Sequence, residues 1–221
     1  MIKAILFDVD GTLIDSNDLH AMAWREAFAH FGEDLSLEAI RAQIGKGGDN
    51  LIPALLPAEL VEAKQKEIES FRSELFGRDY LPRAVPFPGV RTLFEKIYDD
   101  GIKIVLATSA KKAELDFHRG LIACEDLIHA ATSKDDVDHS KPCPDIFEAA
   151  LAKIAPLSRD QVLVVGDSPW DVKAALAAGV RTLAVRCGGF AEETLVEAGA
   201  IAVHKGPEEL ARLFPSWLRL N

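Results

Sequence analysis

Short apolar runs separated by helical patterns recur along most of the chain. The runs are rich in branched residues, and each ends at a polar or turn-forming residue; they span residues 2–7, 102–107, 162–165 and 180–185. Such runs are typical of strands that are buried on both faces of a parallel sheet. Helical patterns adjoin them, for example residues 171–178 with Gly179 as the helix-ending glycine. The alternation predicts an α/β fold with a Rossmann-like, doubly wound parallel sheet.

Residues 16–83 show a different pattern, a nearly strand-free block of amphipathic helices. Apolar positions recur at helical spacing over residues 18–31, 36–44 and 57–80. A proline-rich stretch, residues 82–88, then returns the chain to the α/β pattern. We therefore predict a core domain of residues 1–15 and 84–221, with a helical cap domain of residues 16–83 inserted after the first strand.

Composition and charge narrow the classes of protein that the chain can belong to. Its formal charge of -10 leaves no broad basic field, which argues against a nucleic-acid partner. No apolar run reaches the roughly 18 residues of a membrane-spanning helix, and the apolar N-terminal run is too short for a signal peptide. Three widely spaced cysteines, Cys124, Cys143 and Cys187, indicate neither a disulfide framework nor a zinc site. We expect a soluble cytoplasmic protein, either a monomer or a weak homodimer, without a membrane partner.

Acidic residues follow two of the predicted strands. Asp8 and Asp10 lie in the segment DVDGT after the first strand, and Asp167 and Asp171 lie in GDSPWD after the third. Open α/β sheets bind ligands beyond the carboxyl ends of their strands, so we expect these carboxylates to gather there. Closely placed carboxylates suit Mg²⁺, and four of them would repel one another without a cation. Asp171 can alternatively be a helix-capping acid.

Hydroxyl groups and one lysine are expected at the same edge of the sheet. Thr108 and Ser109 follow the second strand and offer hydroxyl and backbone donors for a phosphoryl group, although such pairs also cap helices. Lys141 lies in the segment SKPCP, whose prolines restrict the backbone and can aim its ammonium group into the crevice. An ordinary surface charge is the alternative for Lys141.

Four motifs follow one another along the chain: a strand with DxDGT, a strand with Thr-Ser, a Lys-Pro loop and a strand with GDxxxD. This ordered set resembles the four motifs of the haloacid dehalogenase superfamily. The helical insert is similar to the C1 cap of its β-phosphoglucomutase-like and phosphoglycolate phosphatase-like members, so the resemblance covers nearly the whole chain. It implies a Mg²⁺-dependent phosphatase in which Asp8 attacks phosphorus and becomes an aspartyl-phosphate. Mg²⁺ and Lys141 would neutralise the charge on the transferring group, and Thr108 would bind a phosphoryl oxygen.

The same resemblance assigns two roles to Asp10. It would protonate the leaving alkoxide and then activate the hydrolytic water, which requires a carboxyl whose pKa is drawn toward the working pH. The implied metal contacts come from Asp8, the backbone carbonyl of Asp10 and Asp167, with Asp171 as a direct or water-mediated supporter.

The identity of residue 10 narrows the reaction within the superfamily. Dehalogenases typically have Tyr there and phosphonatases usually have Ala, whereas Asp10 suits phosphate esters. A phosphatase is the expected activity, and a β-phosphoglucomutase-like hexose-phosphate mutase is the alternative. Against the mutase, position 12 is Thr, which is more similar to phosphatases, and the cap loop of residues 44–49 has no arginine to hold a second phosphate. Lys46 can take the place of that arginine in the mutase alternative. A receiver-like phospho-accepting signalling domain is the non-enzyme alternative, but it would lack the helical insert.

Three cap residues are candidates for contacting a small phosphorylated metabolite. His20 and Trp24 lie one turn apart on the first cap helix, so both can face the crevice. Lys46 lies in a glycine-rich loop whose backbone can approach a ligand closely. The alternatives are a solvated His, a core Trp and a surface Lys. Closure of the cap is expected to exclude water, with hinges at residues 15–16 and 82–88.

Overall fold

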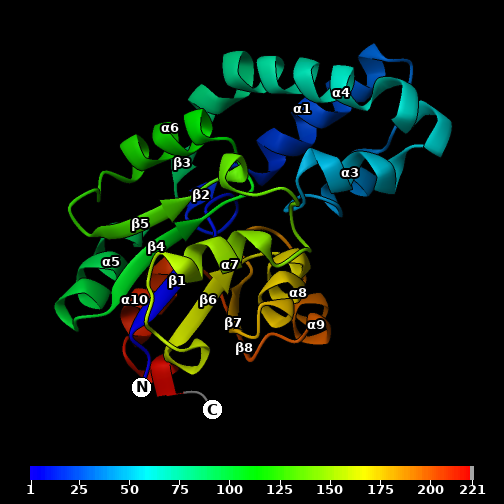
Figure 1. The fold of residues 1–221 in the computed structure, drawn as a ribbon. Coiled ribbons are helices and arrows are strands. Elements are labelled where there is room, and N and C mark those ends of the chain that lie inside the picture. The colour runs from blue at the N-terminus through cyan, green and yellow to red at the C-terminus, as the bar shows by residue number, and fades with distance from the viewer. Residues whose placement is uncertain (220–221) are drawn as a thin grey trace.

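The computed structural model describes residues 1–219 and is built around a six-stranded parallel sheet (Figure 1). The strands are β1 (Ala4–Phe7), β4 (Lys103–Ala107), β5 (Ile128–Thr132), β6 (Val162–Gly166), β7 (Arg181–Val185) and β8 (Ala202–His204), in the spatial order β5-β4-β1-β6-β7-β8. β1 pairs with β4 on one side and β6 on the other, so that Leu6 lies between Val105 and Val164. The predicted α/β fold with a doubly wound parallel sheet is confirmed.

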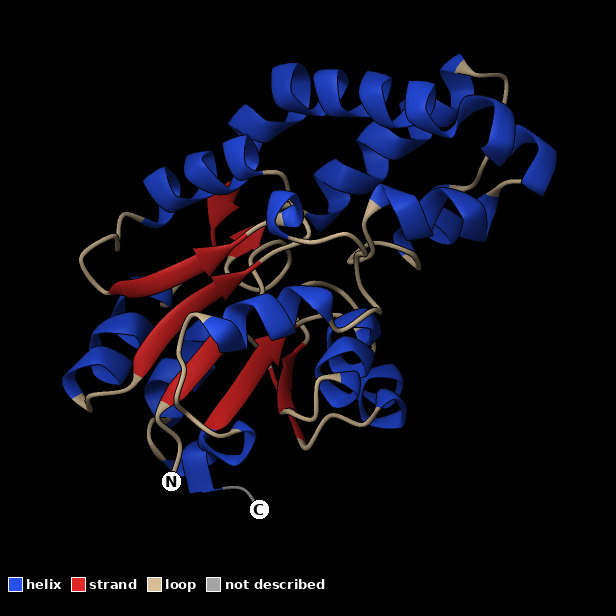
Figure 2. Ribbon diagram, viewed as in Figure 1, coloured by secondary structure: helices blue, strands red, loops and turns tan. Residues whose placement is uncertain are grey.

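Helices cover both faces of this sheet (Figure 2). One face packs against α5 (Val90–Asp99), α6 (Lys112–Ile122) and α10 (Pro207–Leu213), and the other packs against α7 (Asp145–Ala152) and α8 (Pro169–Ala177), with α9 (Glu192–Ala198) beside α8. Ile5 and Phe7 point into the first layer, whereas Ala4 and Leu6 point into the second. Burial on both faces explains why the central strands are continuous apolar runs.

The two edge strands were not expected from the sequence. β5 reads Ile-His-Ala-Ala-Thr and β8 reads Ala-Val-His, and most of their side chains are only half-buried. An edge strand has a neighbour on one side only and is covered less completely, so its sequence need not be a continuous apolar run. The apolar pattern therefore predicted the four inner strands of the sheet and did not predict the edge strands β5 and β8.

The cap helices lie over the carboxyl ends of the strands (Figure 1). They are α1 (Asn17–His30), α2 (Leu37–Arg41), α3 (Gly48–Leu55) and α4 (Ala58–Leu75), followed by the π-helical turn η1 (Phe76–Tyr80) and the short turn η2 (Leu81–Arg83). Trp24 and Phe28 of α1 pack against Ile40, Leu51 and Ile68 in a separate apolar core. Helix α3 was not expected, because glycines precede it and Pro53 interrupts its pattern. Within residues 1–219, no helix is long and apolar enough to cross a membrane.

The chain enters and leaves the cap through a two-stranded antiparallel pair. β2 (Ile14–Asp15) pairs with β3 (Val85–Pro86), with Ile14 opposite Pro86 and Asp15 opposite Val85. The insert therefore follows β2 rather than β1 directly. The pair occupies both predicted hinge segments, and we keep the division into residues 1–15 with 84–221 and residues 16–83 as a proposal.

Candidate active site

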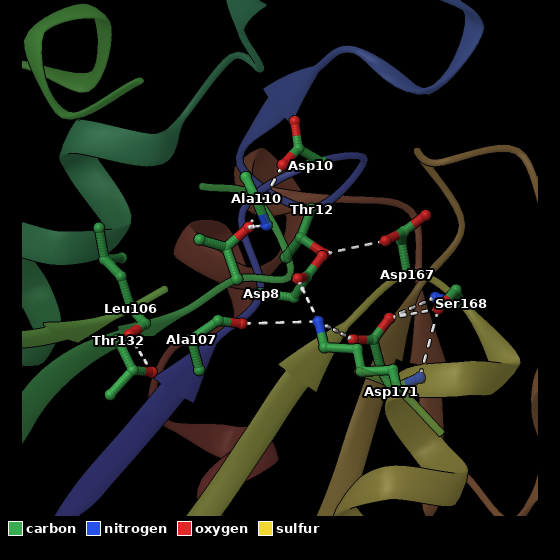
Figure 3. A network of polar contacts seen from close by, with 12 residues as sticks. Asp8, Asp10, Thr12, Leu106, Ala107, Ala110, Thr132, Asp167, Ser168 and Asp171 are labelled. Atoms are coloured by element: carbon green, nitrogen blue, oxygen red, sulfur yellow. Dashed lines mark hydrogen bonds and ion pairs between the residues drawn. The ribbon is translucent and has the colours of Figure 1, made fainter. Parts of the chain in front are cut away.

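Asp8 and Lys141 form a buried ion pair at the end of β1. Nζ of Lys141 lies 2.5 Å from Oδ1 of Asp8 and 2.7 Å from Oδ1 of Asp171, and Lys141 is only 1% exposed. Burial alone would lower the pKa of Lys141, but Asp171 and Asp8 raise it above its ordinary value. The loop lysine is thus a charged group inside the crevice and not a surface charge. Figure 3 shows Asp8 and Asp171 turned toward the same point.

Asp171 is both a helix cap and a site residue. Its Oδ2 accepts hydrogen bonds from the backbone N–H and the hydroxyl of Ser168, at 3.0 and 2.5 Å, while its Oδ1 faces Lys141. Ser168 in turn caps α8, whose first residue is Pro169. Asp171 therefore caps the helix with one carboxylate oxygen and faces Lys141 with the other, and its role as a metal supporter stays a prediction.

Asp167 is held beside Asp8 by two polar side chains. The Thr12 hydroxyl lies 3.2 Å from Oδ1 of Asp167 and 3.3 Å from Oδ2 of Asp8, and Nδ2 of Asn17 donates to Oδ2 of Asp167 at 2.7 Å. Gly11 makes this packing possible, because a Cβ there would lie 2.2 Å from the Asn17 amide and its φ is +78°. The tight turn after Asp10 thus allows Asn17 to reach Asp167.

Asp8, Asp167 and Asp171 form a cluster suited to a divalent cation. Each offers a carboxylate oxygen, and these atoms lie within 4.8 Å of one another. Burial and Asp171 raise the pKa of Asp8 to about 7 against the influence of Lys141, and burial with Asp171 and Asp8 raises that of Asp167 well above its ordinary value. When all three are ionised, these carboxylates exceed the charge of the one ammonium group, and hard oxygen donors match Mg²⁺. The residues present therefore fit the expected metal.

The carboxylate of Asp10 is not part of this cluster. It lies apart from Asp8 and Asp171 (Figure 3) and groups with His20 and Glu114. A metal contact by Asp10 could thus come only from its backbone carbonyl, which stays a prediction.

Mg²⁺ is expected to raise the melting temperature of EDTA-treated protein more at pH 8 than at pH 5. The folded-state pKa of Asp8 is raised, so its contribution to stability is fully present below the ordinary value of 3.8 and is lost as pH rises through about 7. A cation binds the deprotonated carboxylates and offsets this loss at high pH. Thermal melts with and without MgCl₂ at both pH values test this, and a larger shift at pH 5 would contradict it.

Asp10 lies in a polar environment of its own. Its Oδ1 accepts a hydrogen bond from the Ser16 hydroxyl at 2.6 Å and lies 3.0 Å from Nε2 of His20. The Thr108 hydroxyl donates to its Oδ2 at 3.4 Å. Burial alone would raise the pKa of Asp10, but His118, His20 and Ser16 together hold it well below its ordinary value. Asp10 is therefore ionised here, as a base requires, and the expected pKa near working pH is not found in this arrangement.

A small cavity of about 90 Å³ separates these groups from the cap. It is lined by Asp8, Asp10, Thr108, Ser109 and Ala110 from the core, by Glu114 of α6, and by His20, Trp24, Arg72 and residues 44–48 from the cap. Among the described residues, the buried Ser109 hydroxyl has no hydrogen-bond partner, and Thr108 Oγ1 accepts the N–H of Ala110. Hydroxyl and backbone groups thus surround a space of small-molecule size.

The three predicted cap residues differ in where their polar groups point. His20 lines the cavity, with Nε2 toward Asp10 and Nδ1 against the Arg72 guanidinium. Trp24 lines the same cavity and is also part of the cap core. Lys46 borders the cavity, but its ammonium group donates to Gln43 at 2.6 Å and lies 3.9 Å from the centroid of the Trp170 ring.

Arg72, Glu114 and His118 were missed in the sequence. The Arg72 guanidinium lies 5.1 Å from the Trp24 ring centroid, and Oε1 of Glu114 lies 3.5 Å from Nε2 of His20. The helical spacing could have indicated Arg72, because this residue is four positions from both Ile68 and Phe76, on the buried side of its helix. Glu114 and His118 are likewise one turn apart on α6, and His118 is fully buried. In each case a charged or titratable residue stands at a helix position whose neighbours one turn away are buried, and this pattern indicates a residue that faces the interior.

Comparison with known proteins shows the family. A model of the haloacid dehalogenase-like hydrolase family matches residues 5–185, so the chain belongs to that family. It is 28% identical to a phosphorylated carbohydrates phosphatase of Thermotoga maritima, covering 95% of this chain and 96% of that protein. It is 30% identical to a phosphoglycolate phosphatase of Pseudomonas syringae pv. tomato, covering 99% and 81%. These matches confirm the predicted enzyme class.

Two further matches show how much of this chain and of each similar protein the similarity covers. A longer relative, the chloroplastic SUPPRESSOR OF QUENCHING 1 protein of Arabidopsis thaliana, is 29% identical over 90% of this chain, which spans 19% of its length. Among solved structures, a putative β-phosphoglucomutase from Bacteroides vulgatus is 26% identical with a TM-score of 0.84, covering 98% of this chain and 89% of that one. The resemblance inferred from the four motifs is therefore confirmed.

Proposed function

We propose that this hydrolase is a Mg²⁺-dependent phosphatase that cleaves small phosphorylated metabolites through an aspartyl-phosphate on Asp8. The observation that carries the proposal is the position of Asp8 between two sets of groups. On one side lie Lys141 and the carboxylates of Asp167 and Asp171. On the other side is the cavity that also contains Asp10. A phosphoryl group in that cavity would meet a nucleophile, a cation and a proton carrier together.

Asp8, Asp167 and the backbone carbonyl of Asp10 would hold Mg²⁺, with Asp171 as a direct or water-mediated supporter. The bound ion supplies positive charge that offsets the negative charge of the phosphoryl oxygens. Lys141 adds a second positive charge to Asp8 and the transferring group.

The protein groups can carry both halves of the reaction. A carboxylate oxygen of Asp8 attacks phosphorus, the bond to the ester oxygen breaks, and protonated Asp10 gives its proton to the leaving alkoxide. A water molecule then gives a proton to Asp10 and attacks phosphorus, which releases phosphate and restores Asp8. Thr108 and Ser109, which line the cavity, would hold phosphoryl oxygens with their hydroxyl groups. The first half requires Asp10 to gain a proton as substrate binds, because His20, His118 and Ser16 favour its ionised form.

The closed cavity favours a substrate with a small leaving group. Its volume is about 90 Å³, and Arg72 and Glu114 offer one charge of each sign to the part of the substrate beyond the phosphate. A small leaving group favours sugar phosphates and phosphoglycolate over nucleotides. The relatives that act on phosphorylated carbohydrates and phosphoglycolate support the same range.

A hexose-phosphate mutase is the second candidate, and Arg72 is the observation that favours it. A mutase needs a cationic cap group for a second phosphate, and the cap loop of residues 44–49 lacks an arginine. Arg72 of α4 places a guanidinium in the cavity instead. The likeness to a putative β-phosphoglucomutase agrees with this candidate. A receiver-like domain is disfavoured, because the helical insert is present.

Purified protein with MgCl₂ is expected to release phosphate from at least one member of a panel of sugar phosphates, phosphoglycolate and nucleotides. EDTA should stop the release, and MgCl₂ in excess should restore it. Release that continues unchanged in EDTA would contradict the proposal. Interconversion of hexose phosphates that depends on glucose bisphosphate would favour the mutase over the phosphatase.

A further inference from the structure

The cap is hydrogen-bonded directly to the loop that carries Lys141. Nδ2 of Asn50 donates to the backbone carbonyl of Ser140 at 2.9 Å and to that of Lys141 at 3.3 Å. Oδ2 of Asp49 accepts the backbone N–H of Ser140 at 3.0 Å and lies 3.5 Å from Nζ of Lys134. Asp49 and Asn50 lie in the first turn of helix α3 of the cap, whereas Ser140 and Lys141 belong to the core. Two adjacent cap side chains thus bind three consecutive peptide groups, of which the middle one joins Ser140 to Lys141.

Backbone packing brings the two loops close enough for these bonds. A Cβ built on Gly47 would lie 2.1 Å from the Ser140 hydroxyl oxygen, so this approach requires glycine. Ser140 is 1% exposed beneath the cap loop. Burial alone would raise the pKa of Asp49, but the hydrogen bonds from Ser140 and the charge of Lys134 hold it below its ordinary value. Asp49 is therefore an anionic acceptor for the Ser140 N–H.

The backbone that Asn50 binds also carries the ammonium group of Lys141. The same residue that accepts a bond from Asn50 at its carbonyl reaches Asp8 at 2.5 Å and Asp171 at 2.7 Å with its side chain. Asn50 therefore binds the backbone of the residue whose side chain contacts Asp8 and Asp171. If the cap moves away from the core, all of the bonds from Asp49 and Asn50 to Ser140 and Lys141 must break.

We propose that Asp49 and Asn50 are positioning residues that couple closure of the cap to the placement of Lys141. In the closed arrangement they fix the backbone of Ser140 and Lys141, and this holds the ammonium group against Asp8. The site is then fully assembled only when the cap is closed over a substrate. The inference rests on the proposed function, since it gives Lys141 a part in phosphoryl transfer. Neither Asp49 nor Asn50 borders the cavity, so they act through Lys141 and not on the substrate.

The kinetic test uses Asp49→Ala and Asn50→Ala, with Asp34→Ala as a matched control on an exposed cap carboxylate. Each loop variant is expected to lower kcat about tenfold to a hundredfold with little change in KM, because a shift of about 1 Å in a catalytic group has an effect of this size. The loss should be the same factor for two phosphomonoesters with different leaving groups. Asp49→Asn, which keeps an acceptor for the Ser140 N–H, should recover part of it. An unchanged kcat, or a loss that depends on the leaving group, would overturn the proposal.

Hydrogen exchange gives a readout that does not depend on turnover. The Ser140 amide donates to Asp49, so its exchange is expected to be faster in Asp49→Ala than in the wild type or Asp34→Ala, at an unchanged melting temperature. Equal exchange in all three proteins would show that the cap does not hold this loop. If the wild type released no phosphate from any ester, the proposed function would fail, and the exchange rates would still decide whether the cap holds the loop.

Discussion

Asp8→Asn is expected to lower the rate of phosphate release by about 10⁴-fold or more, as removal of a catalytic nucleophile does. The amide cannot form an acyl phosphate, although it occupies nearly the same volume between Lys141 and Asp171. The substitution also removes one of three buried carboxylates that repel one another. The folded state should therefore survive, and the loss should appear in kcat, measured by phosphate release under saturating substrate.

A matched control separates this effect from any general change in charge. Asp99 is an exposed aspartate at the end of α5. Asp99→Asn should leave kcat unchanged, and thermal melts should show that both variants are folded. Substantial activity in a folded Asp8→Asn variant would remove Asp8 from the role of nucleophile.

Lys141→Met is expected to destabilise the protein by about 3–5 kcal/mol in EDTA at pH 8, because it leaves buried carboxylates without their partner. The ammonium group of Lys141 contacts both Asp8 and Asp171, and methionine fills similar space without charge. The loss should be smaller at pH 5, where the raised pKa of Asp8 allows its carboxyl to be protonated and neutral. Urea denaturation at both pH values measures the difference in the free energy of unfolding.

The same variant should also lose about 10²-fold to 10³-fold in kcat, as happens when a positive group at a transition state is removed. Lys66→Met, at an exposed lysine of α4, is the control and should match the wild type in both measurements. If Lys141→Met were as stable as the wild type at pH 8 without metal, the ion pair with Asp8 would not be the contact described here.

The central strands and the positions of the acidic residues at their ends could be predicted because both follow from local sequence. Strands buried on two faces must be apolar throughout, as residues 4–7 are. Ligand groups of an open parallel sheet follow the carboxyl ends of its strands, as Asp8 and Asp167 do. Lys141 was found through the order of the motifs, since nothing local distinguishes it from a surface lysine. The half-buried strands β5 and β8 carried no comparable signal.

Contacts between the cap and the core could not be predicted, because they depend on how two separately packed layers meet. Asn50 and Ser140 are 90 residues apart in the chain, and no periodicity relates them. Lys46 was expected to contact the substrate from its glycine-rich loop, yet its ammonium group donates a hydrogen bond to Gln43 and lies over the Trp170 ring. Arg72 occupies the cavity because η1 and α4 turn their buried side toward His20. These positions are set by packing over long distances.

The most direct test of the account is to trap the phosphorylated enzyme during turnover. Borohydride reduces an acyl phosphate to an alcohol, so treatment of acid-quenched enzyme should convert Asp8 to homoserine. Mass spectrometry of the peptide that contains residue 8 would detect the change. We predict homoserine at this position when substrate and MgCl₂ are present and none when either is omitted. An unmodified Asp8 in enzyme that is turning over, with the modification at another carboxylate, would contradict the account.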